Sequence, residues 1–258
     1  MFEFFNLDER DGIAVATFER LPVNALSYDV YREIGALSEY VEKSESIRVM
    51  ILTASSASRA WIGGADVRDL LECDAQTRMQ RYALINETLP RFYNLDRPVI
   101  AAINGPAVGV GTSIASMCDI RVASCAAFFA KPEIDRGVVA GGGVQLLRLG
   151  MAAGIVREMI YTGRRFSADE MKAAGFLDYV VEPDQVLPKA MESATLIAAK
   201  SLPALKANKL CNNAVEGLNW QDGYKLTQEY SARLTAGNDS KEGIRAFLER
   251  RQAHYQDS

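Results

Sequence analysis

The sequence predicts an α/β fold with an alternating core followed by a purely helical tail. Short apolar runs of strand length alternate with segments of helical spacing over the first part of the chain, which is the pattern of strand–helix units. From Gln185 onward no strand pattern appears, and helical spacing fills the rest of the chain. We therefore expect a strand–helix core at residues 1–184 and a helical region at residues 185–258.

The first half of the core alternates between apolar strands and helices. Its expected strands are the β-rich or apolar runs at residues 13–18, 49–53 and 99–103. Ser27 is a good N-cap for the first helix, which then places one apolar stripe at helical spacing (Val30, Ile34, Leu37 and Val41). A short helix at residues 67–71, which Asp66 can cap, and a long helix at residues 76–92 follow.

The second half of the core is built from shorter elements. Its expected strands lie at residues 120–123, 127–130 and 176–181, and its expected helices at residues 114–118, 141–149, 152–161 and 167–174. Gly150 and Gly163 break the helical segments. In the tail, helical spacing covers residues 185–199, 204–215, 220–234 and 241–251.

Composition and charge narrow the class of protein. The chain has 258 residues, of which 48% are hydrophobic and 24% charged, and this is ordinary globular composition for one large α/β domain. The formal net charge of −4, without a long run of one sign, argues against nucleic acid as a partner. No apolar stretch reaches membrane-spanning length and the first residues do not match a signal peptide, so we expect a cytoplasmic protein without membrane contact.

Cysteine and histidine usage excludes several chemistries. The four cysteines (Cys73, Cys118, Cys125 and Cys211) lack CxxC spacing and are expected to be reduced thiols. The single histidine, His254, lies almost at the end of the chain. Its position excludes a Ser-His-Asp triad and a histidine-rich zinc site in the core, and no metal site is expected.

A glycine-rich turn follows the apolar strand expected at residues 99–103. Residues 104–113 contain the glycines and the proline of this turn, and a small, apolar helical segment comes next. A strand that ends in such a turn and opens a helix leaves unpaired N–H groups at the positive end of the helix dipole, which favours negative charge. Glu133 follows later in the chain, as an isolated carboxylate among apolar residues.

Common motifs do not explain this turn. A dinucleotide fingerprint would need glycine where Ile114 stands, and a phosphate-binding P-loop would need a lysine that is absent from the turn. Ser113 has no histidine nearby in the sequence to activate it as a nucleophile. The glycines could therefore serve only a tight turn. A second glycine turn at residues 63–65, however, also follows a strand-rich segment, and two such turns can aim two N–H groups at one carbonyl oxygen.

Together these segments resemble the crotonase, or enoyl-CoA hydratase/isomerase, superfamily. The resemblance runs over nearly the whole chain, in order and with fitting spacing, through residues 22–26, 60–67, 97–105, 107–111, 118–120, 131–134 and 241–251. It implies a spiral of ββα units with C-terminal helices for trimerisation, hence a homotrimer or a dimer of trimers. The implied substrate is an acyl-CoA thioester, with coenzyme A as part of the substrate and no further cofactor.

The resemblance also implies roles for individual residues. The family's oxyanion hole falls on the N–H groups of Ala65 and Val110, and its acid/base residue falls on Glu133. The implied coenzyme A channel is lined from two segments: Val23 and Ala25 in the first, and Gly63, Ala65, Asp66, Val67 and Arg68 in the second.

One departure from the family bears on the reaction. Its hydratases use two glutamates, but position 113 of this chain is serine, which cannot supply the second carboxylate. A single glutamate beside a thioester still suffices to take a proton and return it elsewhere, so we expect isomerase-like chemistry. Two alternatives stay open: a hydratase or hydratase-lyase that uses Ser113 with Glu133, and a non-catalytic homologue that binds coenzyme A esters or acts as a scaffold. Val110, where the family usually has glycine, narrows the pocket.

Other residues have simpler interpretations. Asp66 can be only a helix cap, and Ser113 can simply pack at a helix start. The large aromatic residues are expected in the core, and three arginines could meet coenzyme A phosphates or lie on a solvated face (Trp61, Phe128 and Phe129; Arg20, Arg59 and Arg68).

Overall fold

The computed structural model describes residues 2–71, 74–141, 147 and 150–257. The helix expected at residues 141–149 falls largely outside these residues, as does Cys73. Within the described ranges, no helix is long and apolar enough to cross a membrane.

A six-stranded sheet forms the centre of the molecule. Its strands lie in the order β1-β2-β4-β6-β8-β11, and all neighbours pair in parallel except β1 with β2. Their bounds are β1 Phe5–Arg10, β2 Ile13–Phe18, β4 Val49–Ala54, β6 Val99–Ile103, β8 Ile120–Ser124 and β11 Tyr179–Val181. The two central strands, β4 and β6, are buried along their whole length, as their continuous apolar sequences predict for parallel strands covered on both faces.

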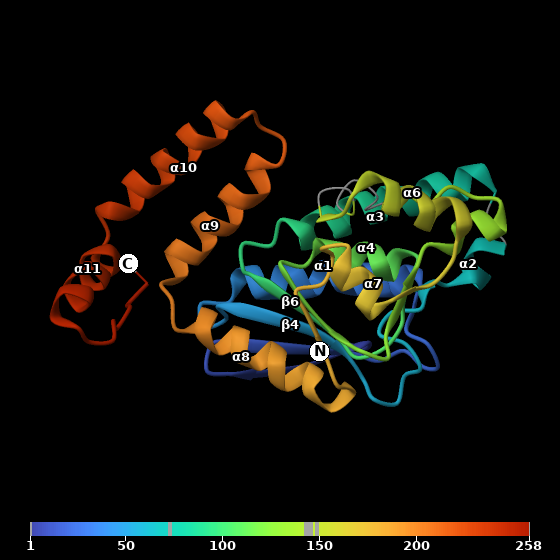
Figure 1. Ribbon diagram of the computed structural model, residues 1–258, viewed down its shortest axis with the longest axis horizontal. Helices are drawn as coiled ribbons and strands as arrows, with labels where there is room; N and C mark the ends of the chain where they lie inside the picture. Colours follow the sequence, from blue (N-terminus) through green and yellow to red (C-terminus); the bar gives the residue numbers. More distant parts are fainter. Residues whose placement is uncertain (1, 72–73, 142–146, 148–149, 258) are drawn as a thin grey trace.

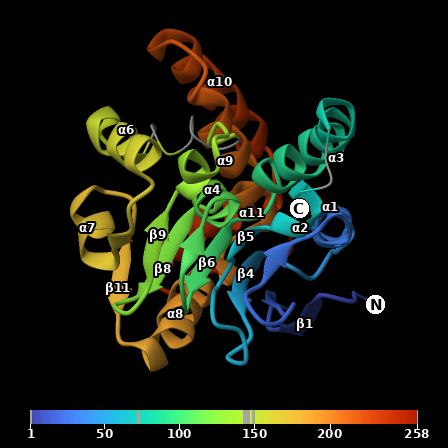
Figure 2. The same cartoon turned by 90° about the vertical axis from the view of Figure 1, so that its right-hand side faces the viewer.

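Helices cover both faces of this sheet (Figure 2). On one face α1 (Tyr28–Lys43), α3 (Ala75–Tyr93) and α4 (Val110–Met117) enclose the larger core with Met50 and Leu52 of β4. On the other face α8 (Val186–Ala198) packs on the alternate residues of the same strand, Val49 and Ile51. The alternation of side chains along β4 therefore decides which residues face which helix layer.

The first helix of the tail, α8, packs against the central sheet. Val186, Ala190 and Ala194 of α8 are fully buried against the sheet, so the first helix of the tail belongs to the core. The division of the chain between residues 184 and 185 stays a prediction. The helical character of the tail is confirmed by α8, α9 (Leu202–Val215), α10 (Trp220–Thr235) and α11 (Asn238–Glu249).

Two smaller sheets build the region beside the central sheet. One has the order β10-β9-β7, with β10 Phe166–Ser167, β9 Phe128–Ala130 and β7 Ala107–Val108, and the other pairs β3 Ala25–Leu26 with β5 Gly64–Ala65. The strand expected at residues 127–130 is therefore present, but in a different sheet from its predecessor. The remaining helical elements are α2 Val67–Leu71, α6 Ala153–Thr162, α7 Ala168–Ala173, η1 Pro132–Arg136 and η2 Pro183–Gln185.

Side-chain caps fix several helix starts. Ser27 accepts a hydrogen bond from the N–H of Val30 at the start of α1, as the sequence predicts. Ser167 and Glu170 form a reciprocal capping box at α7, and Asp74 caps α3 through the N–H of Thr77. Because these caps satisfy N–H groups that a helix cannot pair internally, they set where each helix begins.

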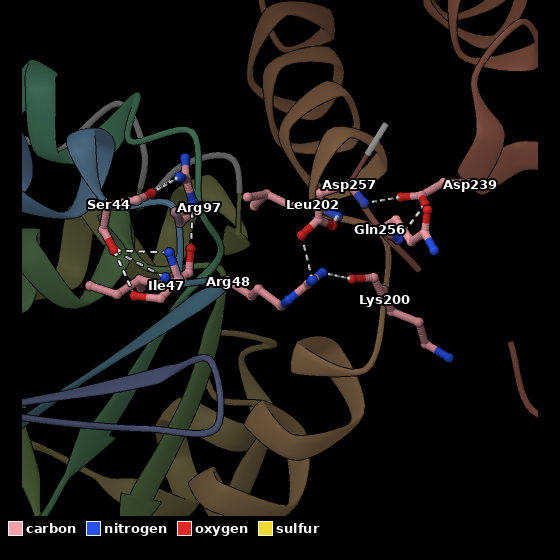
Figure 3. A network of polar contacts seen from close by, with 10 residues as sticks. Ser44, Ile47, Arg48, Arg97, Lys200, Leu202, Asp239, Gln256 and Asp257 are labelled. Atoms are coloured by element: carbon pink, nitrogen blue, oxygen red, sulfur yellow. Dashed lines mark hydrogen bonds and ion pairs between the residues drawn. The ribbon is translucent and has the colours of Figure 1, made fainter. Parts of the chain in front are cut away.

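The C-terminal helices α9, α10 and α11 extend away from the core (Figure 1). The last residues fold back and join these helices to the core (Figure 3). Asp239 accepts hydrogen bonds from the N–H groups of Gln256 (2.8 Å) and Asp257 (3.1 Å). Asp257 in turn accepts from the N–H of Leu202 at 2.9 Å and pairs with Arg48 of the core. One carboxylate thus links α9, the chain end and the loop before β4.

Candidate active site

A pocket of about 1030 Å³, including its open mouth, lies where the two glycine turns meet α3 and η1. It brings together the residues that the sequence singled out for catalysis: Ala65, Val110, Ser113 and Glu133. Gly63 and Val67 of the predicted coenzyme A channel also line it. Residues of α1 and α3 form the far wall of the pocket. Ile85 and Leu89, both on α3, are apolar side chains of this wall.

The first glycine turn is held in place by Asn24. This residue is fully buried, and its side-chain amide donates to the carbonyl oxygens of Phe18, Ala60 and Trp61 at 3.1–3.3 Å. Its Oδ1 accepts from the N–H of Arg20 at 2.7 Å. The side chain therefore ties the β3 segment to the residues that lead into the turn at 63–65. Sequence reasoning treated this stretch only as a turn and missed the part played by Asn24.

The direction of the Ala65 N–H follows from the pairing of β5 with β3. The N–H of Asp66 donates to the carbonyl of Leu26 at 3.0 Å, so Asp66 faces β3. In a parallel pair only alternate residues bond to a given neighbour, so the N–H of Ala65 points away from β3. Ala65 itself lines the pocket, so its N–H is available to the role that the resemblance implies.

The second glycine turn places Val110 at the start of α4. Gly109 is the N-cap, with φ 58° and ψ −120°, a conformation that side-chain-bearing residues rarely adopt. Its N–H donates to Ala130 at 2.8 Å, and the buried Thr112 hydroxyl contacts the carbonyls of Ala107 and Ala130. The N–H of Val110 consequently belongs to the first turn of the helix, where N–H groups lack intrahelical partners.

The two turns are in direct contact. The N–H of Val108 donates to Ile62 at 2.9 Å, and a Cβ on Gly64 would lie 3.1 Å from the carbonyl oxygen of Val108. A Cβ on Gly111 would come within 2.4 Å of the Ile62 carbonyl oxygen, so glycine is needed for this approach. The close packing brings Ala65 and Val110 to the wall of the same pocket, and an oxyanion hole formed by their N–H groups stays a prediction.

Glu133 occupies the first turn of η1 and faces the second glycine turn. Its Oε1 would lie 3.3 Å from a Cβ on Gly109, and only 19% of its side chain is exposed. Its Oε2 is buried and has no hydrogen-bond partner among the described residues. Burying a carboxylate oxygen without a partner is costly, so its presence on a pocket wall is typical of a group that waits for a ligand. Glu133 is thus not a surface ion-pair partner.

Lys131 lies behind Glu133 and was missed by sequence reasoning. The side chain is fully buried, its Nζ donates to Ser113 Oγ at 2.6 Å, and it forms an ion pair with Glu133 Oε1 at 3.6 Å. Burial lowers the pKa of Lys131, and the neighbouring charge of Glu133 opposes that shift. A lysine at the end of an apolar strand, directly before Pro132, was the available sequence signal.

The predicted coenzyme A segments lie together beside the pocket. The carbonyl of Val23 accepts from Gly63 at 2.9 Å, and Arg20 donates to the carbonyl of Ala25 at 3.0 Å. Asp66 pairs with Arg20 at 2.8 Å and accepts from the N–H of Arg68 at 3.1 Å. Burial alone would raise the pKa of Asp66, but these hydrogen bonds outweigh it and lower the pKa. Asp66 therefore caps α2, and coenzyme A binding by these segments stays a prediction.

The far wall of the pocket carries polar groups that are already paired. Arg81 is buried, forms an ion pair with Asp69 at 3.1 Å and donates to the carbonyl of Leu26 at 3.1 Å. Tyr31 packs beside it, and burial raises the pKa of Tyr31 to about 12, so the phenol is neutral at physiological pH. Trp61 and Phe129 are fully buried, as expected for core residues.

Comparison with known proteins agrees with this architecture. Residues 8–258 match the model of the family described as enoyl-CoA hydratase/isomerase. The chain belongs to this family. It is 31% identical to the short-chain-enoyl-CoA hydratase of Clostridium acetobutylicum over 95% of this chain and 94% of that protein. The crystal structure of enoyl-CoA hydratase from Bacillus anthracis superimposes with a TM-score of 0.94 at 27% identity, covering 99% of this chain and 100% of that one.

Membership in the enoyl-CoA hydratase/isomerase family does not identify which reaction of the family applies to this chain. A carnitinyl-CoA dehydratase of Proteus mirabilis is 32% identical over 97% of both chains, about as similar as the hydratase of Clostridium acetobutylicum. Relatives with different names are therefore equally similar to this chain. The residues of the pocket itself must carry any finer assignment.

Proposed function

We propose that this family member moves a proton within an acyl-CoA thioester through a single base, Glu133, in the manner of an enoyl-CoA isomerase. The observation that supports the proposal is the hydrogen bond that Ser113 makes at the position of the second glutamate. Where a hydratase of the family would present a second glutamate, Ser113 accepts a hydrogen bond from the buried Lys131 at 2.6 Å. Glu133 is the only carboxylate among the described residues that line the pocket.

The proposed reaction starts with the substrate carbonyl between Ala65 and Val110. Their N–H groups donate to the thioester oxygen, which lowers the cost of placing negative charge there. Glu133 Oε2 takes a proton from the carbon next to the carbonyl, and the electron pair of the C–H bond moves into the thioester as an enolate. Return of the same proton to the carbon two positions further along shifts the double bond and restores the carboxylate. No atom is gained or lost.

The apolar part of the pocket suits this chemistry. Ile85 and Leu89 supply an apolar wall for an acyl chain, and Val110 narrows the pocket next to the predicted oxyanion hole. Apolar surroundings that exclude water favour return of a proton from Glu133 to the substrate over addition of water to the double bond. Addition of water would instead need a second group to hold and activate the water.

Two alternatives remain in contention. Ser113 lines the pocket and could hold a water opposite Glu133, which would support a hydratase or hydratase-lyase, in line with the names of several relatives. A non-catalytic protein that binds coenzyme A esters is the third candidate. The unpartnered Oε2 of Glu133 favours an enzyme, because a binding protein gains nothing from a buried, unsatisfied carboxylate oxygen.

The test is a comparison of three reactions on one enzyme preparation. A 3-enoyl-CoA and a 2-enoyl-CoA of equal chain length are incubated in deuterated water and followed by NMR. The proposal predicts migration of the double bond and exchange at the carbon beside the thioester, with slower formation of 3-hydroxyacyl-CoA. Hydration that outpaces both would establish the hydratase alternative, and binding without any turnover would establish the non-catalytic one.

A further inference from the structure

Lys131 stands out among the residues that the proposed reaction does not use. It follows β9 directly, and its side chain is fully buried although it ends in an ammonium group. A buried ammonium is costly, and an apolar side chain of similar size would fill the same space more cheaply. Its two polar contacts in the described structure, Ser113 and Glu133, both belong to the pocket wall.

The contacts of Glu133 are unequal at its two oxygens. Oε1 is the atom that pairs with Lys131, at 3.6 Å, whereas Oε2 is the buried atom without a hydrogen-bond partner among the described residues. An ammonium on one side of a carboxylate attracts one oxygen and thereby turns the other away from itself. In this pocket the other oxygen is available to a substrate.

We propose that Lys131 is a positioning residue, which holds Glu133 through Oε1 and turns Oε2 toward the reacting carbon. Ser113 anchors the ammonium by accepting a hydrogen bond at 2.6 Å, so that Lys131 keeps its place between the two. This inference rests on the proposed role of Glu133 as the base. It gives Ser113 a part as the anchor of a cation, in place of the second carboxylate of a hydratase.

The charges in the pocket support the positioning role of Lys131. A second carboxylate beside Glu133 would, when ionised, oppose negative charge on the thioester oxygen. Here the ammonium of Lys131 balances the carboxylate of Glu133, so the pair is neutral when the substrate binds. An enolate formed in this pocket therefore meets less repulsion than in a site with two carboxylates.

The other charged and titratable groups of the pocket are placed differently. Arg78, Arg81 and Tyr82 lie on α3, Tyr31 on α1 and Arg136 at the end of η1. Arg81 is paired with Asp69, and Arg78 donates to the Tyr82 hydroxyl at 3.1 Å. In the described structure, Lys131 is thus the cation that contacts the Glu133 side chain, and its removal is the change that should release the Glu133 carboxylate from its orientation.

The first test replaces Lys131 by methionine, which has similar length and no charge. Without the cation, Oε1 loses its ion-pair partner and the carboxylate can turn away from the reacting carbon. We therefore expect kcat to fall by about 10²-fold because the base is no longer held in the reactive orientation. Affinity for the coenzyme A ester should change less than about threefold, since ground-state binding does not use Lys131.

Matched variants separate charge from packing. Lys131→Ala leaves a space beside Glu133, and added ethylamine should restore part of kcat, whereas ethanol of similar size should not. Ser113→Ala removes the anchor and keeps the charge, so its kcat should fall less than that of Lys131→Met. Loss of kcat in Lys131→Met and Lys131→Ala without rescue by amine would overturn the assignment and make Lys131 a packing residue.

A second readout works without turnover. The carboxylate infrared band of Glu133, identified by its absence in Glu133→Gln, is recorded in wild type and in Lys131→Met at the same pH. A change in the frequency of this band in the variant supports the contact between Lys131 and Glu133 whichever reaction the protein performs, and an unchanged band refutes it. If wild type shows no proton exchange with any enoyl-CoA, the proposed function fails and this measurement still decides on Lys131.

Discussion

Gly109 and Glu133 lie in contact: a Cβ on Gly109 would come within 3.3 Å of the Oε1 atom of Glu133. Gly109 is also the N-cap of α4, whose first residue supplies the Val110 N–H. The proposed base and half of the proposed oxyanion hole are therefore positioned by one residue. Any change at Gly109 should disturb both together.

We predict that Gly109→Ala lowers stability and activity at once. The φ of 58° and ψ of −120° disfavour any side chain, at a cost of roughly 1–3 kcal/mol in the free energy of unfolding. The added methyl group also presses on Glu133, and we expect kcat to fall by about 10²-fold. Urea unfolding and proton exchange into deuterated water measure the two effects.

Gly12→Ala is the matched control, because Gly12 also has a positive φ, 79°, but lies in the β1–β2 turn and meets only the side chain of Arg48 and the carbonyl of Ser46. Its variant should lose stability and keep kcat. Equal loss of kcat in both variants would show that general destabilisation, and not the contact with Glu133, explains the effect.

The sequence predicted the larger elements well because they repeat a physical pattern. The spacing of Val30, Ile34 and Leu37 marks the buried face of α1, and the apolar run of β4 marks a strand covered on both sides. It missed β1 at the sheet edge, which has only two apolar residues, Phe5 and Leu7, and ends in three consecutive charged residues. The Asp11-Gly12 pair between β1 and β2 is a hairpin signal that would have indicated this strand.

The short strands escaped prediction for a different reason. β3, β5, β7 and β10 have two residues each, too few for any periodicity to appear. They pair only because distant segments meet, as Ala25 does with Gly64. The same reason hid Lys131: its burial depends on Ser113 and Glu133 closing around it, which no local pattern reveals.

We predict that hydration of crotonyl-CoA is slow relative to proton exchange. A general acid–base group contributes about 10²–10⁴-fold, and the hydroxyl of Ser113 cannot act as a carboxylate. The measurement compares loss of the enoyl absorbance with incorporation of deuterium. Ser113→Ala is the control: a hydration rate that is high in wild type and lost in this variant would assign the water-holding role to Ser113.

We predict that Glu133→Gln abolishes proton transfer and leaves binding of the coenzyme A ester nearly intact. The amide keeps the size of the side chain but cannot accept a proton, and the N–H groups of Ala65 and Val110 are backbone atoms that the change leaves in place. The loss should therefore appear in kcat and not in affinity. Exchange into deuterated water is measured beside a calorimetric titration, and unchanged exchange would move the base to another residue.

We predict that the ion pair between α9 and the central sheet is important for stability. Lys209 is buried, with its Nζ 2.6 Å from Asp119 Oδ1, and Asp119 also accepts from the N–H of Val99 at 2.7 Å. Lys209→Met leaves that carboxylate unpaired and should cost about 2–3 kcal/mol, less than for a fully buried pair because Asp119 is 29% exposed.

Lys206 on the same helix offers the comparison, since its side chain is 40% exposed and its Nζ lies 3.1 Å from Asp96. Lys206→Met should cost less than about 1 kcal/mol, as is usual for surface pairs. Chemical unfolding of both variants tests the difference, and equal costs would mean that burial of Lys209 does not matter.

The last prediction is that the protein assembles as a trimer or a dimer of trimers through its C-terminal helices. The side chains of Ile244, Phe247 and Leu248 on α11 are exposed by 58%, 82% and 75% in the isolated chain, and apolar surface gathered on one helix is typical of an interface. Phe247→Glu should therefore shift the mass in light scattering toward the monomer, whereas Leu196→Glu, at an exposed apolar position on α8, should not. A wild-type protein that is monomeric at micromolar concentration would contradict the prediction, because the exposed face of α11 would then have no second copy to cover it.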